Sequence, residues 1–440
     1  MQDRKIYSNR VWVNDKLQPA TLTFNEGITS IEFNKSADAE DYGNAVIMPG
    51  VIDVHVHINE PGRTEWEGFE TATQAAAAGG STTIIDMPLN ASPVTTTPDA
   101  FNQKLDASKG KMNVNVGFYA GLIPGNARHL DALIDAGVVG VKCFLTHSGI
   151  DEFPNVTEKD LDEAMPIIAK HNIPLLAHCE LYETEVDCDF NNNPTSYQHY
   201  LASRPKKWEN DAIDLMIKMC RKHNCPVHIV HVASAEALAM IEAAKKEGLP
   251  ITAETCTQYI FFNAEDIPDA NCIYKCAPPI REKANNEQLK HAFTTGVLDF
   301  LTTDHSPAPP NIKEIETGNL KKAWGGIAGI QFLLTASWTA LKDTMKLEQF
   351  IPLVTSKPAH FIKADKKGEF KIGNDADIVI WNPDANDVAK PEDIFFRYKI
   401  SPYIAQNLNG KVLETIVNGA TVYQNKSIQN KNKGQWLLQK

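Results

Sequence analysis

The sequence predicts an α/β protein: a (β/α)₈ barrel, or TIM barrel, joined to a small β-sandwich that the N- and C-terminal segments form together. Three observations indicate this fold. From residue 47 onward, eight short runs rich in β-branched residues alternate with longer segments of helical spacing, the pattern of repeated βα units around a parallel sheet. Short alternating strands occupy both ends of the chain instead. The 440 residues are enough for one such barrel and an accessory domain.

The barrel is predicted from its eight strand candidates. Each is expected to precede a helix, as in residues 66–80, where an alanine-rich body favours helix and the Gly79-Gly80 pair suits its end. We assign the barrel to residues 50–361, a length within the range of this fold. The strands are expected at 47–58, 81–88, 114–120, 138–145, 173–179, 226–233, 250–256 and 298–306.

The two ends of the chain are predicted to pair in the accessory domain. This domain would comprise residues 1–49 and 362–440. The asparagine-rich segment 191–194 is expected to be a surface loop, and residues 429–434 a frayed chain end. The strands of the accessory domain are expected at 5–13, 21–24, 376–381 and 412–423.

The composition excludes several classes of protein. Lys and Arg number 43 and Asp and Glu 55, which gives a formal charge of −12. Without a basic surplus or stripe, neither a nucleic acid nor an anionic membrane is an expected partner. The N-terminus has no apolar stretch after its basic residues, and no long apolar run follows, so we expect a cytoplasmic protein. The eight cysteines form no CxxC pair, which favours reduced, mostly buried thiols.

Polar residues gather at the carboxyl ends of the predicted strands, where barrel enzymes place their catalytic groups. His55 and His57 end the first strand, and residues two apart on a strand point to the same side. His178, His231 and Asp304 end the fifth, sixth and eighth strands. Any one of these histidines could be a hydrogen-bonded structural residue. Together, at matching strand ends, they predict a metal site.

Lys142 lies inside the apolar fourth strand. An ammonium pointing into a barrel would be desolvated, which lowers the lysine pKa. The neutral amine could then react with carbon dioxide to form a carbamate, an anionic group able to bridge two metals. The alternative is a lysine that points outward or pairs with a carboxylate. Five other candidate ligands nearby favour the carbamate.

At these residues the chain resembles the cyclic amidohydrolases of the amidohydrolase superfamily, and among them most closely the allantoinases. The resemblance covers nearly the whole chain. It implies a barrel enzyme that hydrolyses a cyclic amide, with allantoin opened to allantoate as the expected reaction. The segments that carry it are PGVIDVHVHINEPGRTEWEGFETATQAAAAGG (49–80), TTIIDMPLN (82–90), GVVGVKCF (137–144), HCE (178–180), HIVHVAS (228–234), KCAPPIR (275–281), TTDHSPAPP (302–310) and WGGIAGIQ (324–331).

The resemblance implies two divalent metal ions and a hydroxide that bridges them as the nucleophile. Asp304 would also be catalytic, taking the proton of the hydroxide and delivering it to the leaving ring nitrogen. Zn²⁺ is the expected metal, although Co²⁺, Mn²⁺ or Fe²⁺ would suit the same ligands. A homotetramer is also implied. The six metal ligands would be His55 and His57 on one ion, His178 and His231 on the other, carboxylated Lys142 as the bridge, and Asp304 completing the first site.

A second histidine, His228, precedes His231 by three residues. An odd spacing in a strand places the two side chains on opposite sides. We therefore assign His228 as structural.

Smaller signals bear on the substrate. Dihydroorotases carry an arginine two residues after the paired histidines, and Asn59 in this place disfavours dihydroorotate. Arg63, Asn90 and the loop at Ala277 are expected to orient the substrate. Each could instead make only loop contacts. For Arg63 the alternative is a salt bridge with Glu60 or Glu67.

The sequence leaves three questions open: the oxyanion donor, the substrate and whether the protein is catalytic. Hydantoinases use a tyrosine five residues after the lysine as an oxyanion donor, whereas this chain has His147 followed by Ser148, so the donor could be either. A dihydroorotase or a hydantoinase-type enzyme is the alternative within the same chemistry. A non-catalytic scaffold is the alternative outside it, disfavoured because all six metal ligands are present.

Overall fold

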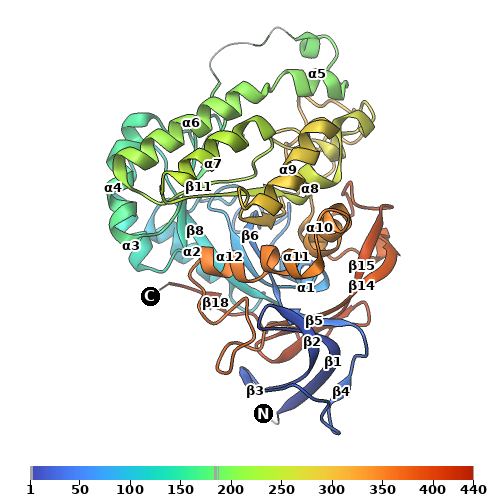
Figure 1. Cartoon of the computed structure of the whole chain (residues 1–440). Helices are drawn as coiled ribbons and strands as arrows, with labels where there is room; N and C mark the ends of the chain where they lie inside the picture. Colours follow the sequence, from blue (N-terminus) through green and yellow to red (C-terminus); the bar gives the residue numbers. More distant parts are fainter. Residues whose placement is uncertain (1–2, 183–185, 187, 440) are drawn as a thin grey trace.

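The computed structural model describes residues 3–182, 186 and 188–439. Figure 1 shows a barrel surrounded by helices and, at one end, a smaller sheet in which both ends of the chain take part. The barrel strands run parallel and are hydrogen-bonded to one another in chain order. They are β6 (Val51–Val56), β7 (Ser81–Asp86), β8 (Asn115–Gly121), β9 (Gly140–Phe144), β10 (Leu175–His178), β11 (Val227–Ile229), β12 (Ile251–Cys256) and β13 (Phe300–Thr302).

Contacts between the first and last strands bring the ring together. A parallel bridge joins Val56 to His305, and the His57 amide donates to the His305 carbonyl at 2.8 Å. Asp53, buried in β6, accepts a hydrogen bond from the Thr303 hydroxyl at 2.5 Å. Because these contacts complete the circle of eight parallel strands, the predicted (β/α)₈ barrel is confirmed.

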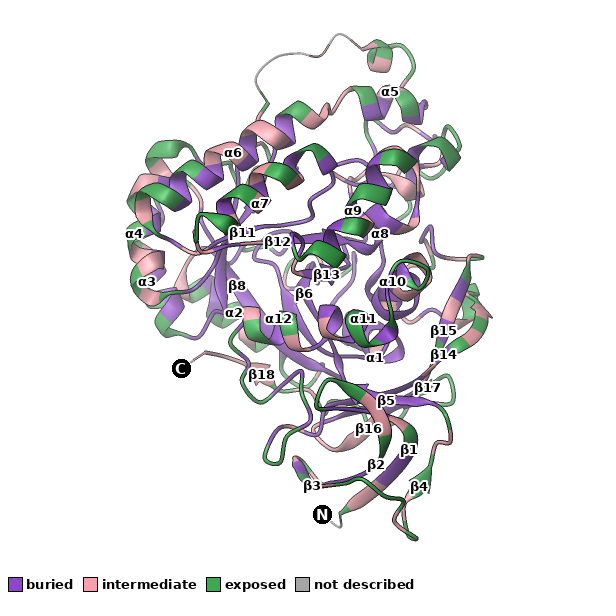
Figure 2. Cartoon of the chain, viewed as in Figure 1, coloured by how far each residue is buried: buried purple, intermediate pink, exposed green. Residues whose placement is uncertain are grey.

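Helices cover the outside of the barrel, with buried inner and exposed outer faces that are visible on α4 and α6 in Figure 2. Capping residues mark the ends of several of these helices. Thr97 caps the N-terminus of α2 by accepting from the Ala100 amide, and Asn172 ends α4 in the left-handed conformation. The helices are α1 (Phe69–Ala78), α2 (Pro98–Ser108), α3 (Leu130–Asp135), α4 (Glu158–His171), α5 (Tyr197–Ala202), α6 (Lys206–His223), α7 (Leu238–Lys246), α8 (Thr257–Phe261), α9 (Lys283–Thr295), α10 (Leu333–Leu341), α11 (Leu347–Val354) and α12 (Ser356–Phe361).

The first predicted strand, 47–58, is two strands. Its beginning, β5 (Val46–Pro49), belongs to the terminal sheet, and the barrel strand β6 starts after Gly50. A Cβ at Gly50 would lie 2.1 Å from the Thr82 side chain, so the chain can pass between the two sheets here only as glycine. The Pro49-Gly50 pair is a turn signal that marks this break, but the apolar residues on both sides of it predict one continuous strand.

The terminal segments form one nine-stranded sheet, as the predicted pairing of the two ends requires. Side chains from both ends of the chain, such as Leu22 and Ile378, pack in a single apolar core. The proposed domain boundaries stay a prediction. The strands are β1 (Arg4–Val13), β2 (Lys16–Phe24), β3 (Ile28–Glu32), β4 (Glu40–Asp41), β5, β14 (Ile378–Val388), β15 (Asn407–Val417), β16 (Ala420–Gln424) and β17 (Ser427–Ile428).

The C-terminal tail departs from the prediction of a frayed end. The Asn432 amide donates to the Asn113 side chain at 3.3 Å and the Gly434 amide to the Met112 carbonyl at 3.0 Å. The short strand β18 (Trp436–Leu437) then pairs in parallel with β8. The tail is therefore held against the barrel by partners more than 300 residues away, a contact that its polar composition does not reveal. The asparagines at 191–193 are exposed, as expected of a surface loop.

The structure also bears on membrane spanning and on the state of the cysteines. No helix in the described part of the chain is long and apolar enough to cross a membrane. All eight cysteines are free, and seven of them are buried.

Candidate active site

The carboxyl ends of the barrel strands open into a cavity of about 510 Å³. All six predicted metal ligands line it, although they come from five different strands or the residues directly beyond them. The structure therefore brings together residues up to 249 positions apart, from His55 to Asp304. Other lining residues include Asn90, His147, Ser148, Arg204, Lys275, Ala277 and Trp324.

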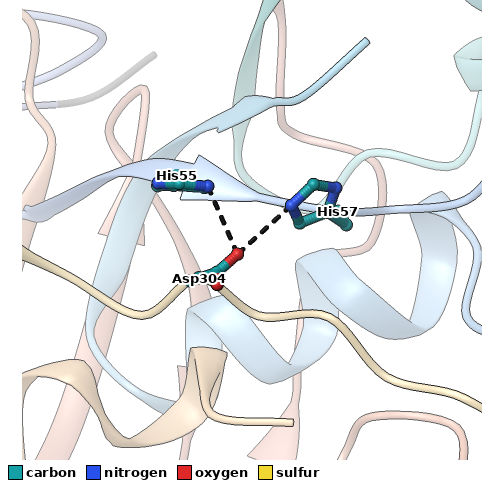
Figure 3. A group of neighbouring side chains, drawn as sticks. All are labelled: His55, His57 and Asp304. Carbon is teal, nitrogen blue, oxygen red and sulfur yellow. Dashed lines mark ion pairs between the residues drawn. The ribbon is translucent and has the colours of Figure 1, made fainter. Parts of the chain in front are cut away.

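His55, His57 and Asp304 form the first group of ligands (Figure 3). The Nε2 atoms of both histidines lie 3.2 Å from the same Asp304 oxygen, Oδ1. One ligand atom from each residue falls within 4.8 Å of the others, a spacing that suits a divalent cation. Burial alone would raise the pKa of Asp304, but the two facing imidazoles hold that pKa well below its usual range. Asp304 is therefore an anion at neutral pH.

His178 and His231 form the second group. Their Nδ1 and Nε2 atoms, respectively, converge to 2.9 Å. The ring of His231 lies 5.5 Å from that of His55, measured between centroids, so the two groups adjoin. Burial lowers the pKa of His178 and, more strongly, that of His231. Both imidazoles are therefore neutral, which is the form that binds a metal.

Lys142 reaches the same cavity from β9. Its side chain is buried, with 1% of the residue exposed, and Nζ has no hydrogen-bond partner in the described part of the chain. It therefore neither points outward nor pairs with a carboxylate there. Burial lowers the pKa of the Lys142 amine to about 8. About a tenth of this amine is therefore uncharged at pH 7, far more than for an ordinary lysine, and the uncharged form is the one that carbamate formation requires.

Two of the ligands sit on strained backbone. His231 and Asp304 have φ angles of 41° and 44°, in the left-handed region that is uncommon for residues other than glycine, although Asn, Asp and His adopt it more often than the rest. Each lies two residues beyond the end of a barrel strand, His231 after β11 and Asp304 after β13. Strain of this kind at a cavity is typical of functional positions.

Two buried carboxylates that the sequence analysis missed contact the ligands. Glu254 lies 2.5 Å from His55 Nδ1, and Glu180 lies 2.8 Å from His178 Nε2. Arg204 in turn donates from Nε to Glu180 at 3.0 Å. The sequence does contain features that point to both residues. Glu180 stands two residues after His178, and Glu254 is a charged residue within an otherwise uncharged strand.

The three predicted substrate contacts lie in different places. Asn90 lines the cavity, with its amide nitrogen 3.3 Å from His57 Nδ1 and its Oδ1 unpartnered among the described residues. Ala277 also lines the cavity. Arg63 is absent from the cavity lining and forms a salt bridge at 2.8 Å with Glu152, not with Glu60 or Glu67.

The structure also gives the surroundings of the two candidate oxyanion donors and of Asn59. The Ser148 hydroxyl donates to the Phe153 carbonyl at 2.7 Å, whereas His147 is exposed and its Nδ1 accepts from the Gly149 amide at 3.1 Å. Asn59 is buried, has a φ of 68°, and directs its amide toward the Pro307 carbonyl at 3.5 Å.

Comparisons with known proteins agree with this geometry. The profile of the amidohydrolase family matches residues 46–422. The allantoinase of Arabidopsis thaliana is 41% identical over 415 residues, which cover 90% of this chain and 82% of that protein. The allantoinase of Saccharomyces cerevisiae is 37% identical, with 98% of each chain covered. The L-hydantoinase (dihydropyrimidinase) from Arthrobacter aurescens has the same fold, with a TM-score of 0.93, 27% identity and 100% of both chains covered. This chain therefore belongs to the amidohydrolase family.

Proposed function

We propose that this protein is an allantoinase, which hydrolyses a ring amide of allantoin to give allantoate at a centre of two divalent metal ions. The observation that carries the proposal is the convergence of four histidines, one aspartate and one unpartnered buried lysine on a single cavity. The curated allantoinases that are 37% and 41% identical over most of the chain support the choice of substrate.

The donor set fits a binuclear centre. His55, His57 and Asp304 would hold one ion, and His178 and His231 the other. Lys142 would bridge them once its neutral amine has added carbon dioxide, which forms an N–C bond, releases one proton and leaves an anionic carbamate. Imidazole and carboxylate ligands suit Zn²⁺, and Co²⁺, Mn²⁺ or Fe²⁺ would bind the same set. When bound, such ions lower the pKa of a water toward neutrality and polarise a carbonyl.

Asp304 is the proposed general base and acid. It is an anion at the mouth of the barrel, between the two histidines of the first group. It would accept the proton of the attacking water and deliver it to the ring nitrogen as the amide bond breaks. Its Oδ1 atom lies 3.2 Å from Nε2 of both His55 and His57, which places the carboxylate beside the proposed first ion.

Asn90 and the loop at Ala277 would orient the substrate. The unpartnered Asn90 Oδ1 is an acceptor at the cavity wall and suits an N–H group of a hydantoin ring or ureido arm. Ala277 has no polar side chain, so it would contribute backbone groups. For the oxyanion, His147 is the better of the two candidates, because the single Ser148 proton is engaged by a backbone carbonyl. Arg63 would act indirectly, by holding the Asn90 loop through the Asn90 carbonyl at 3.3 Å.

A hydantoinase-type activity is the second candidate, because the L-hydantoinase fold matches over its whole length. One experiment separates the possibilities. The metal-loaded protein is incubated with allantoin, dihydroorotate and a 5-substituted hydantoin, and ring opening is followed with and without a chelator. We expect chelator-sensitive opening of allantoin. Activity on dihydroorotate or the hydantoin alone would refute the proposed substrate, and no activity on any of them would favour a non-catalytic scaffold.

Asn59 offers a direct test of the difference from dihydroorotases. An Asn59→Arg variant is expected to gain dihydroorotate turnover if this position selects the substrate. The homotetramer and the cytoplasmic location stay predictions, which size-exclusion chromatography with light scattering and cell fractionation would test.

A further inference from the structure

Glu254 on β12 is fully buried and uses its two oxygens on two different histidines. Oε1 lies 2.5 Å from His55 Nδ1, and Oε2 lies 3.1 Å from His228 Nε2. His55 is a proposed metal ligand, whereas His228 does not line the cavity. The carboxylate therefore connects the metal centre to a residue of the barrel interior.

His228 is itself held in one orientation. Its Nδ1 lies 2.7 Å from the Thr252 hydroxyl, and its ring stacks on Phe300 with an interplanar angle of 12°. Strands β11 and β12 pair His228 directly with Thr252. When the Thr252 hydroxyl donates to Nδ1, the hydrogen of the neutral imidazole lies on Nε2 and is donated to Glu254. This contact fixes the second oxygen of the carboxylate.

The arrangement determines the tautomer of His55. As a metal ligand His55 would be neutral, and a carboxylate facing Nδ1 then keeps the hydrogen on that nitrogen, so the lone pair lies on Nε2. Nε2 is also the atom that lies 3.2 Å from Asp304 in the first ligand group. Carboxylates that accept from the far nitrogen of a ligand histidine fix its orientation and increase its basicity.

We propose that Glu254 is a positioning residue that sets the affinity of the first metal site, by orienting His55 while His228 and Thr252 hold Glu254 in place. This inference rests on the proposed binuclear centre and adds a determinant for one of its two ions. The competing explanation is that Glu254 is a buried charge that serves only the stability of the barrel.

The test measures metal binding instead of turnover. Wild-type protein and a Glu254→Gln variant are stripped of metal, and two stepwise Zn²⁺ dissociation constants are obtained by competition with a chromophoric chelator. We expect two ions per wild-type chain. In the variant, one dissociation constant should rise by roughly 10- to 100-fold, the usual effect of losing such a partner, and the other should change less.

Glu414→Gln is the matched control. Glu414 is also a fully buried carboxylate, but it pairs with Arg4 at 2.7 Å in the terminal sheet. Both Zn²⁺ constants should be unchanged in this control. Unchanged constants in a folded Glu254→Gln protein, or an equal rise in both, would overturn the inference and leave the proposed function standing. A wild-type chain that binds fewer than two ions would overturn the binuclear centre itself.

A second variant keeps the inference testable if Glu254→Gln does not fold. Thr252→Val removes the hydroxyl that fixes His228 at nearly constant volume. We expect a smaller rise in the same dissociation constant, with a circular dichroism spectrum like that of the wild type. No rise in either constant would overturn the inference.

Discussion

The Lys142 Nζ atom lies 5.0 Å from the centre of the Phe144 ring. An apolar neighbour, instead of a carboxylate, thus faces this buried amine. No hydrogen-bond acceptor in the described part of the chain engages the Lys142 amine. The amine therefore stays available for reaction with carbon dioxide.

A Lys142→Ala variant should lose the binuclear centre and most activity, because the bridging anion is missing. A short carboxylic acid such as acetate or propionate should partly restore both by occupying the space of the carbamate. Metal content by mass spectrometry and allantoin turnover check this expectation. The same acid should not stimulate the wild type. Unchanged turnover in the variant would rule out the carbamate.

Reactivation of the metal-free protein should depend on pH. Only the neutral Lys142 amine reacts with carbon dioxide, and burial lowers its pKa to about 8. Above that pH most of the amine is neutral, whereas below it the neutral fraction falls about tenfold per pH unit. The rate of recovery with Zn²⁺ at constant carbon dioxide pressure should follow this fraction between about pH 6.5 and 8. A rate independent of pH would argue that carbamate formation does not limit recovery.

Asn90 and Arg63 should differ in their effect on catalysis. Asn90→Ala removes a group at the cavity wall, and kcat/KM should fall by roughly ten- to a hundredfold, as for a lost buried hydrogen bond. Arg63→Ala removes a half-exposed salt bridge with Glu152, so the fall should stay below about fivefold. Steady-state kinetics on the two variants test the ranking. A larger effect of Arg63→Ala would indicate direct substrate contact.

Lys313→Met should loosen one wall of the cavity. The buried Lys313 side chain donates from Nζ to the carbonyls of Lys275 at 2.8 Å, Trp324 at 3.1 Å and Gly326 at 2.5 Å, and so joins two loops at the cavity. Loss of these bonds should reduce the free energy of unfolding by about 2–4 kcal/mol and raise KM. Denaturant unfolding and kinetics check both effects. Lys363→Met, which loses one exposed bond to a carbonyl, is the control expected to change neither.

Gly434→Ala should detach the C-terminal tail. A Cβ at this position would lie 1.9 Å from the Val114 carbonyl oxygen, so β18 could not keep its place beside β8. We expect a loss of about 1–3 kcal/mol in stability, the usual cost of overpacking, together with faster proteolysis of the tail. Thermal unfolding and limited proteolysis measure these effects. Zn²⁺ content should not change, since the tail does not line the cavity.

Much of this molecule could be predicted from local patterns. Eight βα units are visible as apolar runs of the right length, and His55, His57, His178, His231 and Asp304 are recognisable because they end those runs. A parallel barrel places every strand end at one mouth, so their convergence follows from the fold. Lys142 could be singled out because a charged residue in an apolar strand requires an explanation.

Other features arise only from contacts between distant segments. The pairing of Glu254 with His55 joins positions 199 residues apart, and it depends on the stagger of the strands around the barrel, which no local period encodes. The pairing of the C-terminal tail with β8 and the salt bridge of Arg63 with Glu152 also join segments that are distant in the sequence. Composition and periodicity thus specify the histidines, the aspartate and the lysine that face the cavity, whereas strand register and loop packing determine which other residues line it and which of them touch one another, because those contacts form only when the ring of strands is complete.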